Sequence, residues 1–261
     1  MAIAAHCWGR PRARLGLLLG VALALAAGCR PARPRGQAAV ACRTATRQFE
    51  NPATHRPIPV RTYAPASGQL AGLKVALLNH GYGIANSRYS FIARHLVAHG
   101  YFVLSVQQVL PTDAPLPTTG NPAQVRRPAW ERGVQNLRAV LAELPRAYPG
   151  LDLGHTLLVG HSFGGDIVML FAQEHPAEIE RVISLDNCRM PLPRQAQPRV
   201  LSLRSSDQQP DAGVLPTAAE QAALGMRIVA LPATRHGEMN DYATKAQRQE
   251  MNRYISEFLA P

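Results

Sequence analysis

The stretch Val159-Gly160-His161-Ser162-Phe163-Gly164-Gly165-Asp166 contains the pattern Gly-x-Ser-x-Gly, and its surroundings decide the fold. A short apolar run of strand type precedes it at 155–159, and apolar residues at helical spacing follow it up to His175-Pro176. A sharp turn from a buried strand into a helix pushes its central side chain out of the sheet. We therefore interpret Ser162 as a nucleophile on such a turn, the alternative being an ordinary glycine turn.

Strand and helix patterns alternate along most of the chain. Strand patterns occur at 40–49, 57–63, 74–79, 101–106, 155–159, 181–185, 199–203 and 227–231, and helix patterns at 87–98, 129–144, 164–174, 217–224 and 241–259. This alternation predicts an α/β fold with a mostly parallel central sheet and helices on both faces. With 261 residues, 46% of them hydrophobic, the chain can bury one large core, so we expect a single catalytic domain at 40–261.

The first 28 residues have the layout of an export signal. Three arginines precede the uncharged apolar stretch Leu15–Ala27, whose 13 residues are too short to span a bilayer comfortably. The stretch ends in Leu25-Ala26-Ala27-Gly28-Cys29, which resembles a bacterial lipoprotein signal, although such signals usually carry leucine where Ala26 stands. We expect residues 1–28 to be a signal peptide and 29–39 a flexible tether, with the exported protein anchored to the membrane through a lipidated Cys29. Cleavage near Ala26, giving a soluble periplasmic or secreted protein, and an uncleaved anchor remain alternatives.

The net charge is +11, and removal of residues 1–28 leaves +8 because that segment holds three arginines and no acids. The arginines are scattered, without a basic helix, so the sequence argues against a nucleic-acid partner and favours a basic surface beside anionic lipids. Cys42 and Cys188 are either a disulfide or two buried thiols. No metal-type spacing or nucleotide loop occurs, so we expect neither metal nor cofactor.

Four polar features follow strands of the predicted parallel sheet. They are His80-Gly81-Tyr82-Gly83 after 74–79, Ser162 after 155–159, Asp186 after 181–185, and His236 after 227–231. Sites in sheets of this kind lie at the carboxyl ends of the strands, so these features are expected to converge.

Their residue types fit acyl transfer. A serine hydroxyl needs an imidazole to take its proton, and the imidazole needs a carboxylate to fix its tautomer. The order Ser162, Asp186, His236 is the one that α/β-hydrolases use. Asp207, with Asp211 nearby, also follows a strand, so it stays an alternative acid; any of these aspartates could instead be a cap or turn former. His236 could also be an ordinary loop histidine.

Four segments together resemble a known family. HGYG at 80–83, GHSFGG at 160–165, LDNCRMPLP at 185–193 and the histidine in TRHGEMNDY at 234–242 are similar to segments of platelet-activating factor acetylhydrolases and their bacterial α/β-hydrolase relatives. The resemblance implies that Asp186 is the acid. It also implies that the backbone N–H groups of Tyr82 and Phe163 form the oxyanion hole.

The segment 108–127 departs from the regular alternation. It has little predicted secondary structure, and a loop that long in a compact domain is usually functional. We expect it to cover the pocket and set the substrate. Arg126 and Arg127 at its end could bind a substrate carboxylate or phosphate, or could be a solvated pair at a helix start.

These inferences predict an exported serine hydrolase that cleaves carboxylic esters of small or lipid-like molecules through an acyl-enzyme. An amidase, thioesterase or carbon-carbon hydrolase on the same fold is one alternative, because fold and triad do not fix the leaving group. A surface-anchored binding protein without turnover is another.

Overall fold

The structure is a computed structural model that describes residues 41–261. The expected signal peptide, the tether and Cys29 lie outside the described residues. No helix within 41–261 is long and apolar enough to cross a bilayer.

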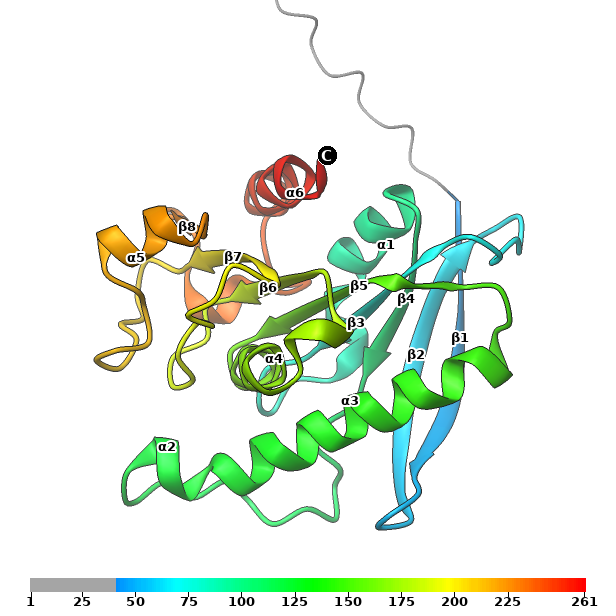
Figure 1. The fold of residues 1–261 in the computed structure, drawn as a ribbon, viewed down its shortest axis with the longest axis horizontal. Coiled ribbons are helices and arrows are strands. Elements are labelled where there is room, and N and C mark those ends of the chain that lie inside the picture. Colours follow the sequence, from blue (N-terminus) through cyan, green and yellow to red (C-terminus); the bar gives the residue numbers. More distant parts are fainter. Residues whose placement is uncertain (1–40) are drawn as a thin grey trace, which may run out of the picture. The chain divides into compact units, whose positions relative to one another are not determined.

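A single sheet of eight strands forms the centre of the described chain, in the order β1-β2-β4-β3-β5-β6-β7-β8 (Figure 1). The strands are β1 (Cys42–Asn51), β2 (Arg56–Pro65), β3 (Lys74–Asn79), β4 (Tyr101–Val106), β5 (Asp152–His161), β6 (Arg181–Leu185), β7 (Arg199–Arg204) and β8 (Arg227–Ala230). β1 and β2 pair antiparallel, as do β2 and β4, and every pair from β4 to β8 is parallel. The mostly parallel sheet that the alternation predicted is therefore confirmed.

Helices cover both faces of the sheet (Figure 1). α1 (Ser90–Ala98) and α6 (Lys245–Leu259) lie on one face, and α3 (Arg127–Ala147) and α4 (Phe163–Glu174) lie on the other. The remaining short elements are α2 (Pro122–Val125), α5 (Ala218–Ala223) and 3-10 turns at Asn86–Tyr89, Pro176–Glu178 and His236–Glu238.

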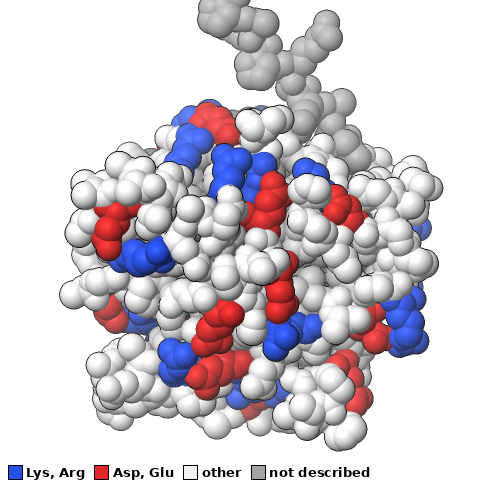
Figure 2. Space-filling view, viewed as in Figure 1, with Lys and Arg blue, Asp and Glu red and all other residues white. Residues whose placement is uncertain are grey.

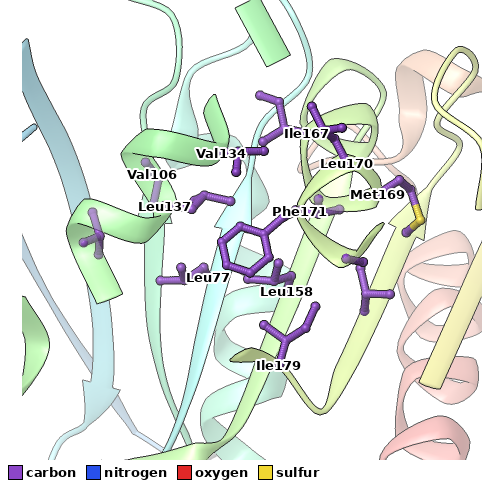
Figure 3. Close-up of a cluster of buried hydrophobic side chains, with 14 of the residues drawn as sticks. Leu77, Val106, Val134, Leu137, Leu158, Ile167, Met169, Leu170, Phe171 and Ile179 are labelled. Atoms are coloured by element: carbon purple, nitrogen blue, oxygen red, sulfur yellow. The ribbon is translucent and has the colours of Figure 1, made fainter. Parts of the chain in front are cut away.

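The core beneath α3 and α4 is built around Phe171 (Figure 3). This side chain of α4 is fully buried among Leu77 and Leu158 of the sheet and Leu137 of α3. Full burial of one such side chain stabilises the fold by about 1.5–3 kcal/mol, so the two helices are held firmly to the sheet. α4 in particular is fixed, which matters because Ser162 immediately precedes it.

Several helix boundaries differ from the sequence-based expectation. The last helix begins at Lys245 rather than 241, because Thr244 and Gln247 form a capping box there. Asp241 instead accepts the backbone N–H groups of Ser90 and Phe91 at the start of α1, at 3.0 and 3.1 Å. The helix expected at 129–144 continues through Pro145 to Ala147.

Charged side chains are mixed over the surface that Figure 2 displays. Lysines and arginines alternate with aspartates and glutamates there, rather than gathering into a patch of one sign. Many charged side chains of the described residues are paired, as in Arg127 with Glu174 and Arg253 with Glu257. On this face the excess of positive charge is therefore spread out.

Candidate active site

Ser162 occupies a strained turn between β5 and α4. Its backbone φ is +52°, a value that residues other than glycine rarely adopt. The turn is possible because its neighbours lack side chains: a Cβ on Gly160 would lie 2.2 Å from the carbonyl oxygen of Gly164, and one on Gly164 would lie 2.6 Å from that of Asn79. The sharp strand-to-helix turn inferred from Gly-x-Ser-x-Gly is present.

The structure brings Ser162, His236 and Asp186 into one hydrogen-bonded line. Nε2 of His236 lies 2.9 Å from Oγ of Ser162, and Nδ1 of His236 lies 2.7 Å from Oδ2 of Asp186. A carboxylate oxygen can only accept, so Nδ1 carries the proton and Nε2 is free to accept the serine hydroxyl proton. This is the tautomer that a general base requires.

Asp186 is fully buried yet surrounded by donors. Oδ1 lies 2.9 Å from Nη2 of Arg204, and Ser205 donates both its backbone N–H and its hydroxyl to the carboxylate. Burial alone raises the pKa of Asp186, but the hydrogen bond from His236, the Arg204 charge and the Ser205 bonds outweigh it and hold the pKa below its usual range. The carboxylate is therefore ionised at neutral pH.

Asp207, the alternative acid, holds the same histidine by its backbone instead. Its Oδ1 accepts the backbone N–H of His236 at 2.7 Å, and its Oδ2 accepts Nε of Arg235 at 3.1 Å. The backbone N–H of His236 is the first cause that lowers the pKa of Asp207. Asp211 is paired with Arg189. The ring of His236 is thus left to Asp186.

Of the two expected oxyanion donors, Phe163 directly follows Ser162 and Tyr82 lies near Phe163. Phe163 opens α4, where the first N–H groups lack intrahelical acceptors. Tyr82 lies in the turn after β3, and its ring is 6.1 Å from that of Phe163 in an edge-on arrangement. Within residues 41–261, neither backbone N–H donates to another group of the protein. Both are therefore free to bind an oxygen.

The segment 108–127 is held to the rest of the domain by hydrogen bonds and an ion pair. Gln108 donates its N–H to Nε2 of the buried His80 at 2.9 Å, and Asp113 pairs with Arg56 at 2.5 Å. Leu116 donates its N–H to the Tyr82 hydroxyl at 3.2 Å. The segment has little secondary structure, as expected, apart from the short helix α2, which Asn121 caps. The link to Tyr82 brings the middle of this loop beside the candidate site.

Arg126 and Arg127 make contacts inside the protein. Nε of Arg126 donates to the carbonyl oxygen of Pro117 at 3.1 Å, which braces the loop. The guanidinium of Arg127 pairs with Glu131 at 2.7 Å and Glu174 at 3.0 Å. Within the described chain neither arginine contacts the triad, and their binding of a substrate anion stays a prediction.

Cys42 and Cys188 are free thiols, so the alternative of a disulfide between them is excluded. Potential metal-ligand atoms of Asp186, Cys188 and His236 all lie within 4.8 Å of one another. Burial raises the pKa of Cys188 to about 11, so it is a neutral thiol at physiological pH. The Arg204 cation beside Asp186 also disfavours a metal ion there. The expectation of no metal stays a prediction.

Sequence reasoning missed Arg204, and it gave His161 no role. Arg204 closes β7, and the pairing of Leu185 with Leu203 puts residue 204 beside residue 186. His161, the variable residue of the turn, donates Nε2–H to the carbonyl oxygen of His236 at 3.0 Å. The only signal for Arg204 was a charged residue at the end of a strand expected to be buried.

Comparison with known proteins places these features in context. A family model described as serine aminopeptidase, S33, matches residues 73–186, from the start of β3 to Asp186. Chlorophyllase-1 of Arabidopsis thaliana is 30% identical over 138 residues, which are 52% of this chain and 39% of that protein. The chain thus spans well under half the length of this curated relative.

Solved structures match over a greater length. A ferulic acid esterase from Streptomyces cinnamoneus superposes with a TM-score of 0.60 at 15% identity, covering 87% of this chain and 91% of that one. A lidless α/β serine hydrolase from Xanthomonas campestris gives a TM-score of 0.54 at 18% identity, covering 83% and 93%. At these identities the likeness establishes the fold alone.

Proposed function

We propose, from the premise that the chain is an α/β-hydrolase by fold, that it is a serine hydrolase that cleaves carboxylic esters through an acyl-enzyme. The observation that carries the proposal is the line from Ser162 Oγ to His236 Nε2 at 2.9 Å and from His236 Nδ1 to Asp186 Oδ2 at 2.7 Å. A hydroxyl, an imidazole and a buried carboxylate in this geometry are the parts that acyl transfer needs.

The reaction follows from these contacts. Nε2 of His236 takes the proton of Ser162 as Oγ attacks the ester carbonyl, and the carbonyl oxygen becomes an oxyanion bound by the N–H groups of Tyr82 and Phe163. Collapse of this intermediate breaks the bond to the alcohol oxygen, which receives the proton from His236. Water then repeats the sequence on the acyl-enzyme, so the acid leaves and Ser162 regains its proton.

The aromatic residues beside Ser162 support an ester with an apolar portion. Tyr82 is 44% exposed, which is unusual for a large hydrophobic side chain within residues 41–261, and it stands edge-on to Phe163. An apolar acyl or alcohol group would remove this surface from water. The esterase structures of the same fold are in keeping with such a substrate.

The proposal is tested with a fluorophosphonate probe and a series of p-nitrophenyl esters of increasing chain length. Covalent labelling at Ser162, together with ester turnover, is expected for the wild-type protein and not for Ser162→Ala. A wild-type protein that neither labels nor turns over any ester would support a binding protein without turnover instead.

A second candidate is cleavage of an amide or peptide bond. The description of the matching family, a serine aminopeptidase, favours it, and the same triad serves both reactions. Parallel assays with an acyl p-nitrophenyl ester and the matching acyl p-nitroanilide separate the two. A kcat/KM for the anilide equal to or above that for the ester would favour the peptidase.

We also propose that the protein is exported and anchored to a membrane through a lipidated Cys29. The support is the sequence of residues 1–29, with its arginines, apolar stretch and small residues before the cysteine.

A further inference from the structure

A chain of buried hydrogen bonds runs from the turn after β3 to the backbone of His236. The N–H of Gly81 lies 2.9 Å from the Tyr89 hydroxyl, which lies 2.8 Å from Nδ1 of His161. Nε2 of His161 lies 3.0 Å from the carbonyl oxygen of His236. Tyr89 and His161 are almost completely buried, so water does not compete for these bonds.

The chemistry of the groups decides which one donates in each of these hydrogen bonds. The carbonyl oxygen of His236 can only accept, so His161 carries its proton on Nε2. Burial, and then the neighbouring His236 ring, lower the pKa of His161 to about 3, so the ring is neutral and its Nδ1 accepts the Tyr89 proton. Burial raises the pKa of Tyr89, which keeps that proton in place, and the Tyr89 oxygen accepts from Gly81. Each of these hydrogen bonds therefore joins one donor to one acceptor.

The same residues are in tight contact. The ring centroid of His161 is 4.9 Å from that of His236 and 5.8 Å from that of Tyr89. A Cβ on Gly81 would lie 2.9 Å from Nδ1 of His161, so the turn that carries Tyr82 rests directly on this ring. Asp207 accepts the backbone N–H of His236, and His161 donates to the carbonyl oxygen of His236. The backbone of His236 is therefore held at both groups.

We propose that Tyr89 and His161 are positioning residues. They couple the position of the turn after β3, which carries Tyr82, to the position of the general base His236. The inference rests on the proposed serine-hydrolase function. The transition state uses the Tyr82 N–H and the His236 ring together, whereas substrate binding in the ground state does not depend on their mutual alignment. Loss of the connection therefore lowers kcat and leaves KM nearly unchanged.

The first test is Tyr89→Phe, which removes one oxygen and leaves both the Gly81 N–H and Nδ1 of His161 without a partner. The control is Tyr101→Phe, because Tyr101 is equally buried but lies at the amino end of β4, away from the site. We expect kcat on p-nitrophenyl butyrate to fall about 10- to 100-fold in Tyr89→Phe with KM changed less than about twofold, and neither to change in the control. Unchanged kcat in Tyr89→Phe, or an equal loss in both variants, overturns the proposal.

A double-mutant cycle with His161→Gln tests the coupling. If both residues act through the same series of hydrogen bonds, the double variant Tyr89→Phe/His161→Gln is expected to lose no more activity than the worse of the two single variants. Losses that multiply would mean two independent packing residues, and would overturn the proposal. The rate of fluorophosphonate labelling is measured on the same proteins. Absence of labelling in the wild type defeats the proposed function, whereas equal labelling rates in wild type and Tyr89→Phe defeat only the positioning role.

A measurement on the wild-type protein keeps the proposal falsifiable if the variants do not fold. Long-range proton–nitrogen NMR correlations distinguish the two neutral forms of an imidazole. We expect His161 to hold its proton on Nε2 throughout the neutral pH range, with Nδ1 bare. A proton on Nδ1, or a ring that titrates near neutral pH, breaks the chain at its centre and overturns the inference.

Discussion

Nη2 of Arg204 lies 2.9 Å from Oδ1 of Asp186, and both residues are buried. Nη1 of the same guanidinium donates to the carbonyl oxygen of Asn187 at 2.7 Å, which fixes its position. The carboxylate that faces the His236 ring with one oxygen therefore holds a permanent cation on the other. A positive charge there keeps Asp186 ionised and opposes the development of positive charge on His236.

Arg204→Gln is expected to move the acidic limb of the kcat/KM profile to higher pH by about one unit. Arg204 is among the causes that lower the pKa of Asp186, so its loss raises the pH at which the carboxylate takes up a proton. The other ionisable groups near the ring of His236 are Asp207, bound to its backbone, the neutral His161, and the neutral thiol of Cys188.

The control for this profile is Arg235→Gln. Arg235 precedes His236 in the chain, but its side chain is 73% exposed, so solvent and salt screen its charge. We expect the acidic limb of the kcat/KM profile of Arg235→Gln to coincide with that of the wild type. If Arg204→Gln lowers activity by the same factor at every pH, the guanidinium acts only as a structural support.

Ser162→Ala is expected to reduce ester turnover by several orders of magnitude, as loss of a triad member should. The fold should remain, because the change removes one oxygen and leaves the crowded glycine positions intact. Turnover by purified protein and far-ultraviolet circular dichroism check the two statements. Retention of wild-type turnover would refute the serine-hydrolase proposal.

Asp186→Asn is expected to cost far more activity than Asp207→Asn. An amide at 186 favours the wrong His236 tautomer, a change that costs about 10⁴ in turnover in serine proteases. At 207 the amide oxygen can still accept the backbone N–H of His236, so we expect a loss of less than about tenfold. Comparable losses in the two variants would contradict this division of roles.

Thermal unfolding of these two variants separates catalysis from folding. Asp186→Asn leaves the Arg204 charge buried without its partner, so it should lose about 3 kcal/mol of unfolding free energy. Activity is therefore compared well below the melting temperature of each variant.

Cys29→Ala is expected to move the protein from the membrane fraction to the soluble exported fraction, because the acyl chains would supply the anchor. Cys42→Ala is the control, since Cys42 is a free thiol of the folded domain. Fractionation of cells that express each variant gives the answer. Identical behaviour of both with the wild type would indicate ordinary signal cleavage.

Local sequence patterns were sufficient for most of the sheet. The bounds of β3, β4 and β6 agree residue for residue with the apolar runs, because strands buried on both faces carry an uninterrupted signal. The turn at Ser162 was found because Gly-x-Ser-x-Gly is a local pattern between a strand and a helix, although Gly164 is also required by the distant Asn79. The start of α6 was misjudged because the turn before it carries Asp241, which serves the distant helix α1.

The residues that contact and support the triad could not be predicted from the sequence. Arg204 and Asp186 meet through strand register, and His161 meets Tyr89 across the fold, so neither contact leaves a pattern at a fixed spacing. Asp207 shows the limit most clearly. It follows a strand as a triad acid could, and only the path of the loop decides that its carboxylate binds the backbone of His236 and not the ring.

The positive φ of Ser162 has a consequence for engineering. Glycine would relieve this backbone strain, which costs on the order of 1 kcal/mol, so the conformational preference of the turn opposes the residue on which the proposed chemistry depends. Selection of random variants for heat resistance alone would thus reward Ser162→Gly and discard turnover. A thermostabilisation campaign on this protein has to score activity in every round, or hold position 162 fixed.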